Sequence, residues 1–237
     1  MRPSKKRKIV FADAFAGCGG LSLGLMQAGL HGRFAIEHDK FAFETLRANF
    51  LAKKSKFKFT WPRWLPKKPI SIGRLLKRYR KELEIIEGSI DVLVGGPPCQ
   101  GFSSAGRRRH DDPRNQLFAS YLQIVDILKP RAVLIENVRG FTMDFDMEPR
   151  VKNYAQNLRR RLSEKYDVYE VLLDLSQFGV PQLRTRYFIL ALQSGLCLEN
   201  PFDLLTKRLP SFLRSMRLNA PVSSTAPSRE TYIGRHP

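Results

Sequence analysis

Ten residues, Gly95-Gly-Pro-Pro-Cys-Gln-Gly-Phe-Ser-Ser104, follow the apolar run 90–94 and indicate how the chain is organised. A short β-branched run that stops at glycines and prolines is typical of a buried strand whose carboxyl end opens into a loop. In α/β sheets, such loops carry the ligand-binding and catalytic groups. The two prolines stiffen the backbone directly before Cys99. The Cys99 thiol is therefore a candidate nucleophile, the alternative being the small buried hydrophobe that most free cysteines are.

The composition bounds the class of protein. The 237 residues, 43% of them hydrophobic, suffice for one large α/β domain or two small ones. The sequence contains no apolar run of membrane-spanning length, and the amino terminus lacks the apolar core of a signal peptide. We therefore expect a protein of the cytosol or nucleoid that does not span a membrane. The basic residues 5–8 are more simply explained as a solvated chain end than as a nuclear address.

The charge predicts a polyanionic partner. The chain has 41 Lys and Arg against 22 Asp and Glu, a formal net charge of +19. Nucleic acid is the leading partner for such an excess, with an acidic protein or an anionic membrane as alternatives. The three cysteines are far apart and form no Cys-x-x-Cys pair, so we expect neither disulfides nor a metal site.

Two early segments indicate a nucleotide-binding sheet. The apolar run 8–11 leads into Asp13-Ala-Phe-Ala-Gly-Cys-Gly-Gly20 and then a helical pattern, the order strand, glycine loop, helix. Ser22 stands where a dinucleotide fingerprint has its third glycine, and a simple tight turn would look similar. A second strand, 34–36, ends at Glu37, which is placed to accept hydrogen bonds from ribose hydroxyls. Asp39 is a candidate cap for a helix over 40–50.

Residues 53–68 combine Lys and Arg with Phe and Trp. Such a segment can follow a phosphate backbone or stack on bases. An irregular surface insertion with its aromatic side chains tucked under is an equally good interpretation. A basic amphipathic helix over 73–87 follows.

The segment after Cys99 is small, polar and cationic through Arg114, typical of a loop that closes over a polyanion. A helix over 115–128 and a buried strand over 132–135 follow. That strand brings Glu136 to the same sheet edge as Cys99. A carboxylate at a strand end is often a helix cap or a salt-bridge partner, and beside apolar walls it could instead hold a proton for delivery.

The remaining pattern predicts a helix over 150–164 and strands over 168–173 and 187–192. In an extended segment Gln182, Arg184 and Arg186 share one face, as donors for a carboxylate, a phosphate or a base edge. The pattern decays after Gln193. Together the elements predict an α/β fold with a mostly parallel sheet and helices on both faces.

In this order, the motifs resemble those of the DNA cytosine-5 methyltransferase family. The matching pieces, which span residues 8–192, are Asp13-Ala-Phe-Ala-Gly-Cys-Gly-Gly20, Glu37-His-Asp39, Gly95-Gly-Pro-Pro-Cys-Gln-Gly-Phe-Ser103, Asp112-Pro-Arg-Asn-Gln-Leu-Phe118, Glu136-Asn-Val138 and Gln182-Leu-Arg-Thr-Arg186. The combination is highly specific. It implies the Rossmann-like fold of S-adenosylmethionine-dependent methyltransferases, here incomplete, with a catalytic domain over 8–192. Residues 193–237 would then be an irregular tail or the start of a target-recognition region.

The resemblance also implies the site. S-adenosylmethionine would be bound by Asp13, Phe15, Gly17, Gly19, Gly20, Leu21, Glu37 and Pro98. Cys99 would add to carbon 6 of a cytosine flipped out of double-stranded DNA, Glu136 would stabilise protonated ring nitrogen 3, and Arg184 and Arg186 would hold the base and the pocket. The DNA would be contacted by Gln100, Ser103, Arg107, Arg108, Arg109 and Gln182.

Two departures from the family pattern matter. The aspartate that usually binds the adenine amino group has no clear equivalent, and Ser71 is the best candidate. The target-recognition region and two later motifs are not visible before Pro237, so we expect a second polypeptide to supply them. The alternatives are a truncated enzyme, a non-catalytic DNA-binding or regulatory relative, and an RNA cytosine methyltransferase.

Overall fold

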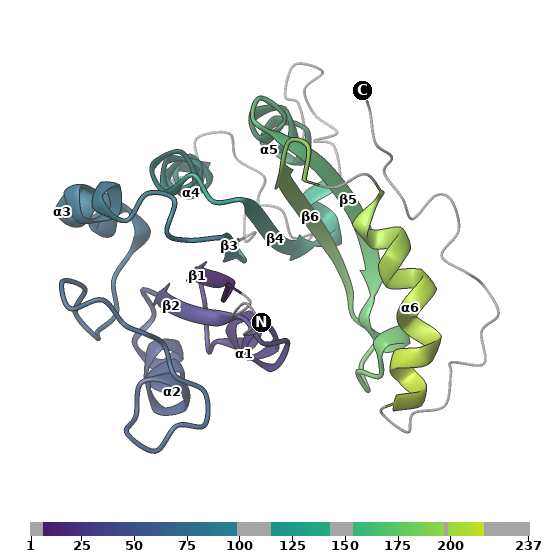
Figure 1. Cartoon of the computed structure of the whole chain (residues 1–237), viewed down its shortest axis with the longest axis horizontal. Helices are drawn as coiled ribbons and strands as arrows, with labels where there is room; N and C mark the ends of the chain where they lie inside the picture. The colour runs from purple at the N-terminus through teal and green to yellow at the C-terminus, as the bar shows by residue number, and fades with distance from the viewer. Residues whose placement is uncertain (1–6, 99–114, 143–153, 197–198, 216–237) are drawn as a thin grey trace, which may run out of the picture. The chain divides into compact units, whose positions relative to one another are not determined.

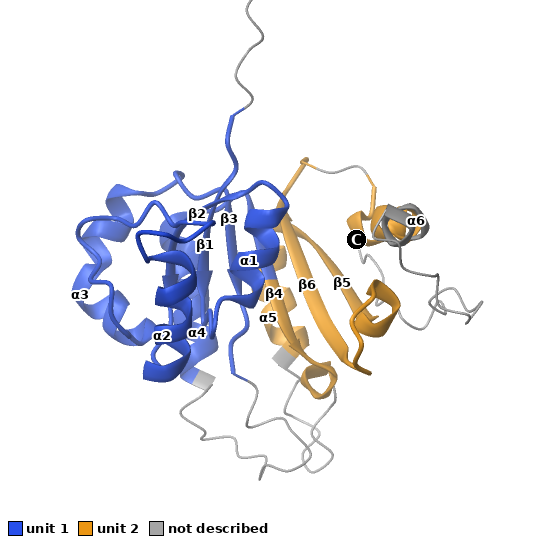
Figure 2. Cartoon of the chain, turned by 90° about the horizontal axis from the view of Figure 1, so that it is seen from below, with its two compact units in different colours: residues 1–98, 111–134 blue, residues 99–110, 135–237 orange. Residues whose placement is uncertain are grey.

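The computed structural model describes residues 7–98, 115–142, 154–196 and 199–215 (Figure 1). The chain forms two compact units, one of residues 1–98 and 111–134 and one of residues 99–110 and 135–237 (Figure 2). Each unit contains a buried hydrophobic cluster of its own.

Six strands form a sheet in the order β2-β1-β3-β4-β6-β5. Their bounds are β1 Val10–Ala14, β2 His31–Ile36, β3 Val92–Gly95, β4 Ala132–Val138, β5 Tyr166–Asp174 and β6 Thr185–Gln193. β1 pairs in parallel with β2 and β3, whereas β5 and β6 are antiparallel. This mostly parallel α/β sheet confirms the predicted fold class.

The helices that the sequence predicts lie close to their expected positions, and α6 and two short 3-10 helices are additional. The first unit contains α1 Gly20–Gln27, α2 Lys40–Phe50, α3 Ile72–Ile85 and α4 Asn115–Leu128. The second contains the short 3-10 helices η1 Arg139–Thr142 and η2 Leu175–Phe178, with α5 Tyr154–Ser163 and α6 Pro201–Ser215. Asp39 caps α2 as expected, since its carboxylate accepts the Ala42 N–H at 2.8 Å. None of the described helices is long and apolar enough to cross a membrane.

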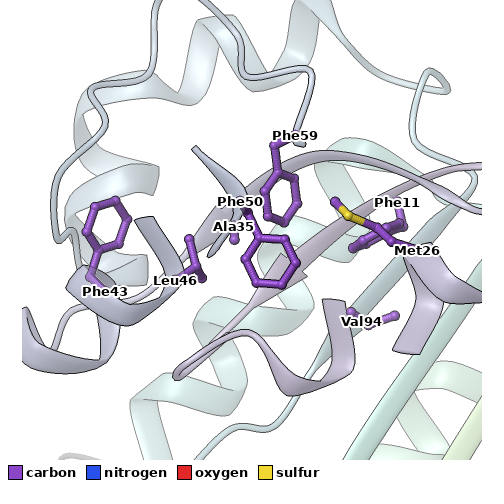
Figure 3. Close-up of a cluster of buried hydrophobic side chains, with 8 residues drawn as sticks. All are labelled: Phe11, Met26, Ala35, Phe43, Leu46, Phe50, Phe59 and Val94. Carbon is purple, nitrogen blue, oxygen red and sulfur yellow. The ribbon is translucent and has the colours of Figure 1, made fainter. Parts of the chain in front are cut away.

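The first unit has one buried hydrophobic cluster, and the register of its strands brings three loops to the same sheet edge. Eight side chains from the strands, α1, α2 and the following loop form its buried cluster (Figure 3), namely Phe11, Met26, Ala35, Phe43, Leu46, Phe50, Phe59 and Val94. Ala14, the last residue of β1, is in register with Ile36 and with Gly95, the last residues of β2 and β3. The carboxyl ends of these strands are therefore level, and the loops after them share one edge.

Phe59 resolves the interpretation of the basic, aromatic segment. Its ring contacts Phe50 and Phe11 edge-on at 5.6 and 5.9 Å between centroids, and the side chain is 7% exposed. Phe57 and Trp61 pack against the same cluster while remaining partly exposed, so the aromatic side chains of this loop are directed toward the core, as the insertion interpretation predicts.

In the second unit, β5 and β6 pair from Tyr166↔Gln193 to Asp174↔Thr185. The buried Tyr187 hydroxyl donates to the Glu170 carboxylate, and Arg159 lies 3.7 Å from the same carboxylate. Burial, with the charge of Glu170, raises the pKa of Tyr187 above its ordinary range. This polar network fixes α5 against the β5–β6 pair.

The expectation of an irregular tail after Gln193 is wrong for residues 201–215, which form α6. Pro201 occupies its first position, where a missing N–H costs nothing, and the Asn200 side chain accepts the Phe202 N–H at 3.0 Å. Phe202 packs against Tyr169 and Val171. The helix is therefore stabilised by a tertiary contact that its own sequence pattern does not reveal.

Candidate functional site

A cavity of about 90 Å³ lies at the shared edge of β1, β2 and β3. It is lined by Phe15, Ile36, Glu37, His38, Ile70, Ser71, Ile72, Pro98 and Leu117. Ligand pockets usually start at about 300 Å³, so this cavity suits one part of a nucleoside-sized ligand, such as a purine ring. Three predicted cofactor residues, Phe15, Glu37 and Pro98, therefore meet around one space.

The loop after β1 is held in an unusual backbone conformation. Phe15 has φ 61°, rare for an aromatic residue, and its ring stacks on that of the fully buried Tyr121 at 6.4 Å between centroids. Gly17 and Gly19 also have positive φ, 55° and 91°. A Cβ at Gly19 would lie 2.5 Å from the Phe50 ring. The strain at Phe15 is thus sustained by packing, as is common where a backbone is shaped around a ligand.

Glu37 anchors this loop to the end of β2. Its Oε2 accepts the Gly17 N–H at 2.8 Å, and its Oε1 accepts the N–H groups of His38 and Asp39, both at 2.7 Å. The Glu37 backbone carbonyl accepts the Ile70 N–H at 2.7 Å. One 7% exposed residue therefore joins the loop after β1, the start of α2 and the segment before α3.

Asp13 lies in the interior and does not line the cavity. It is completely buried, and its Oδ2 accepts the Ser22 hydroxyl at 2.6 Å. Its other oxygen, Oδ1, finds no hydrogen-bond partner among the residues that the structure describes. Burial raises the pKa of Asp13 to about 7, and the hydrogen bond from Ser22 opposes that shift. Asp13 and Ser22 thus pin the first turn of α1 to β1, which explains why a serine suits the position of the third glycine.

The other predicted cofactor residues have supporting positions. Gly17, Gly19, Gly20 and Leu21 do not line the cavity, and Leu21 packs against the hydrophobic cluster of Figure 3. Sequence reasoning missed Ile36, His38, Ile70, Ile72 and Leu117. The signals for them were the strand-end position of Ile36, the two isoleucines around Ser71, and the family motifs that contain His38 and Leu117.

Ser71 does line the cavity, as its assignment to the adenine position requires. It is also the N-cap of α3, because its hydroxyl oxygen accepts the Arg74 N–H at 3.3 Å. The hydroxyl oxygen retains a second lone pair, which can accept a further hydrogen bond.

The second unit brings Glu136 and both predicted arginines together. Arg186 Nε lies 2.8 Å from Glu136 Oε1, and Arg184 Nη2 lies 4.0 Å from the same oxygen. The Arg184 carbonyl accepts the Leu175 N–H at 2.9 Å, which ties the start of β6 to the end of β5. Two cations thus face one half-buried carboxylate within β4, two residues before its last residue Val138.

Gln182 does not share this arrangement. Its N–H donates to the Val180 carbonyl at 2.8 Å, so the chain turns there, and the side chain is exposed. The predicted extended face is therefore wrong at Gln182 and holds only for Arg184, which directly precedes β6, and Arg186, the second residue of β6.

Six predicted residues lie outside the described part of the chain: Cys99, Gln100, Ser103, Arg107, Arg108 and Arg109. Among the described residues, no three His, Cys, Asp or Glu side chains are grouped as a metal site would need.

The family model of C-5 cytosine-specific DNA methylases matches residues 9–231. The chain belongs to this family. It is 35% identical over 192 residues to the Type II methyltransferase M.AgeI of Thalassovita gelatinovora, covering 80% of this chain and 41% of that protein. It is 38% identical over 180 residues to M.NaeI of Lentzea aerocolonigenes, covering 76% of this chain and 38% of that protein.

The fold agrees with this family. The crystal structure of a Spodoptera frugiperda DNMT2 mutant matches with a TM-score of 0.56 and 26% identity, over 80% of this chain and 51% of that one. The fold is the Rossmann-like fold of S-adenosylmethionine-dependent methyltransferases, as the motifs implied. The chain spans about 40% of the length of the two curated relatives named above.

Proposed function

We propose that this C-5 cytosine methylase chain binds S-adenosylmethionine and transfers its methyl group to carbon 5 of cytosine in DNA. The observation that carries the proposal is the cavity that joins Phe15, Glu37 and Pro98 at the level ends of three parallel strands. Pro98 directly precedes Cys99, so the same loop would serve both the cofactor and the base.

The cavity residues fit the nucleoside half of the cofactor. Phe15 and Ile72 offer apolar surfaces for the adenine, and the Glu37 carboxylate retains lone pairs for ribose hydroxyls. Ser71 would meet the adenine amino group in place of the usual aspartate, and Asp13 would act indirectly by holding the loop. When bound, S-adenosylmethionine supplies an electrophilic methyl group.

The chain's own residues would make the cytosine reactive. The Cys99 thiolate would form a bond to carbon 6, which places electron density on carbon 5. Glu136, oriented by Arg186, would stabilise protonated ring nitrogen 3 as the charge develops. After methyl transfer, loss of the carbon 5 proton and elimination of the Cys99 sulfur would restore the ring and release the product.

Both faces of the ring are used in this reaction, so the cytosine would leave the duplex. Residues 100–109, with their three consecutive arginines, would contact the DNA and offset that cost. We also propose that target recognition comes from residues outside this sequence, in a further part of the same protein or in a second polypeptide.

A covalent trap tests the chemistry. DNA with 5-fluorocytosine cannot lose a proton from carbon 5, so the protein should form a stable adduct with it in the presence of S-adenosylmethionine. Cys99→Ser should abolish the adduct, and the matched control Cys197→Ser should not. An adduct that survives in Cys99→Ser contradicts the assignment, and trapping on RNA instead of DNA would reassign the substrate.

Transfer of labelled methyl groups tests the need for other residues. The 237-residue chain alone should be weak, and adding the recognition region of a longer relative in trans should increase transfer. Full, sequence-selective transfer by the chain alone would contradict the requirement.

A further inference from the structure

Residues 53–81, which include the cavity residues Ile70, Ser71 and Ile72, carry many cations that do not line the cavity. They include twelve Lys and Arg and no Asp or Glu, namely Lys53, Lys54, Lys56, Lys58, Arg63, Lys67, Lys68, Arg74, Lys77, Arg78, Arg80 and Lys81. All twelve side chains are exposed. We refer to these twelve side chains as the basic surface.

The basic surface rests on an ordered base. The segment comprises the loop between α2 and α3 and most of α3 itself (Figure 1). Its apolar side chains point inward, since Leu65, Ile72 and Leu75 are 2%, 1% and 0% exposed. The Trp61 indole N–H donates to the Leu65 carbonyl at 2.7 Å, which closes the loop on itself. The cations are therefore held on a folded platform and not on a free chain.

Four of the cations form a stripe along α3. Arg74, Lys77 and Arg78 follow the spacing i, i+3, i+4, which places them on one helix face, and Lys81 follows after the bend in the helix at Tyr79. α3 bends at Tyr79, whose ring lies 5.7 Å from that of Trp64 and 5.7 Å from the Arg78 guanidinium carbon. The contact with Tyr79 limits the freedom of Arg78 while leaving its charge uncompensated.

The basic surface is almost unneutralised. Arg80 pairs with Glu84 at 2.9 Å, and within the described ranges none of the other eleven cations makes an ion pair. Like charges at this density repel one another, and a polyanion would relieve that repulsion. No large apolar side chain between residues 53 and 81 is exposed. A membrane or an apolar protein interface would therefore bury no large apolar side chain here, whereas a row of phosphates would contact Lys and Arg side chains.

We propose that the basic surface binds the phosphate backbone of duplex DNA outside the site where the cytosine reacts. It would contribute affinity and association rate without reading bases, because Lys and Arg contacts to phosphates carry no sequence information. The proposal rests on charge and exposure and does not require that Cys99 is the nucleophile.

The test is fluorescence-anisotropy binding of a labelled duplex of arbitrary sequence to the full chain at several KCl concentrations. The variant Arg74→Gln, Lys77→Gln, Arg78→Gln, Lys81→Gln removes the α3 stripe, and glutamine preserves helix propensity. We expect at least about tenfold weaker binding and a salt slope that is smaller by roughly one for each phosphate that is no longer neutralised. Circular dichroism should show an unchanged fold.

The matched control removes the same total charge elsewhere, by Arg47→Gln, Arg131→Gln, Arg160→Gln and Lys207→Gln, all exposed positions. It should keep the wild-type salt slope. If DNA binding weakened equally in both variants, the effect would depend on net charge alone, and the proposal would be overturned. Unchanged binding in the α3 variant would also overturn it, as would loss of binding to phosphatidylserine vesicles with DNA binding intact. Cys99→Ser should bind the duplex like the wild type, which separates this result from the fate of the proposed chemistry.

Discussion

Glu37 and Glu136 are two carboxylates held at strand ends by opposite means. Glu37 accepts three backbone N–H groups, from Gly17, His38 and Asp39. Glu136 faces two arginine side chains, at 2.8 and 4.0 Å. Backbone donors are fixed by the fold, whereas a guanidinium must be ordered by its own contacts.

The two environments suit two different roles, cofactor binding for Glu37 and catalysis for Glu136. The surroundings of Glu37 are preformed and change little with any single neighbouring side chain, as suits a permanent cofactor contact. The surroundings of Glu136 depend on particular side chains that can be replaced one at a time. Substitutions should therefore affect catalysis on the Glu136 side and cofactor affinity or stability on the Glu37 side.

The largest effect is expected for Arg186→Gln. Losing the 2.8 Å partner of Glu136 should lower kcat for methyl transfer by about 10²–10³-fold, typical of removing one charge-stabilising donor. Arg184→Gln, at 4.0 Å, should cost roughly tenfold. The measurement is single-turnover methyl transfer, with calorimetric titration of S-adenosylmethionine expected to be unchanged. Leu183→Gln, a 90% exposed neighbour, is the matched control. Equal losses of kcat in all three variants would show that the distance to Glu136 does not determine the size of the effect.

Glu37→Gln should weaken S-adenosylmethionine binding by about 10–100-fold, because the amide loses one acceptor oxygen and leaves a backbone N–H unpaired. At saturating cofactor, kcat should change much less. Isothermal titration calorimetry provides the affinity, with the exposed α2 residue variant Glu44→Gln as control. A kcat effect as large as that of Arg186→Gln would contradict the proposed division of roles.

Gly19→Ala tests how rigidly the backbone around Glu37 is held. The added Cβ would meet the Phe50 ring at 2.5 Å in a backbone with φ 91°. We expect a loss of about 1–3 kcal/mol in the free energy of unfolding, measured by urea denaturation. Gly24→Ala in α1, which meets open space, should be neutral or stabilising by up to about 1 kcal/mol. Similar results for both variants would show that the loop adapts easily.

The smallest effect concerns Asp13, a buried carboxyl group with no cation beside it. Because its pKa is raised to about 7, the folded protein binds a proton that the unfolded chain releases at lower pH. Its contribution to the free energy of unfolding should therefore fall by about 1 kcal/mol from pH 6 to pH 8. Asp13→Asn should remove this slope from urea unfolding curves. An unchanged slope would mean that another group titrates there.

Local patterns predicted most of the elements. The period of apolar residues set α2 and α4 at the observed residues, and the short apolar runs before Glu37, Gly95 and Glu136 predicted three strands. Those signals suffice because amphipathic periodicity and short apolar runs are properties of the local chain. α6 and the turn at Gln182 were missed because one depends on packing of Phe202 against β5 and the other on a single turn within a polar segment.

The sequence by itself determined the family, the strand ends and the types of residue at them, because the motifs and their order are contained in the linear chain. Only the tertiary structure decided which of those residues meet. In the structure, the Glu37 carboxylate accepts three backbone N–H groups, and Asp13 is buried in the core beside Ser22. Arg186 lies closer to Glu136 than Arg184 does. The physical reason is that distance and burial depend on strand register and helix packing, which join residues far apart in the chain.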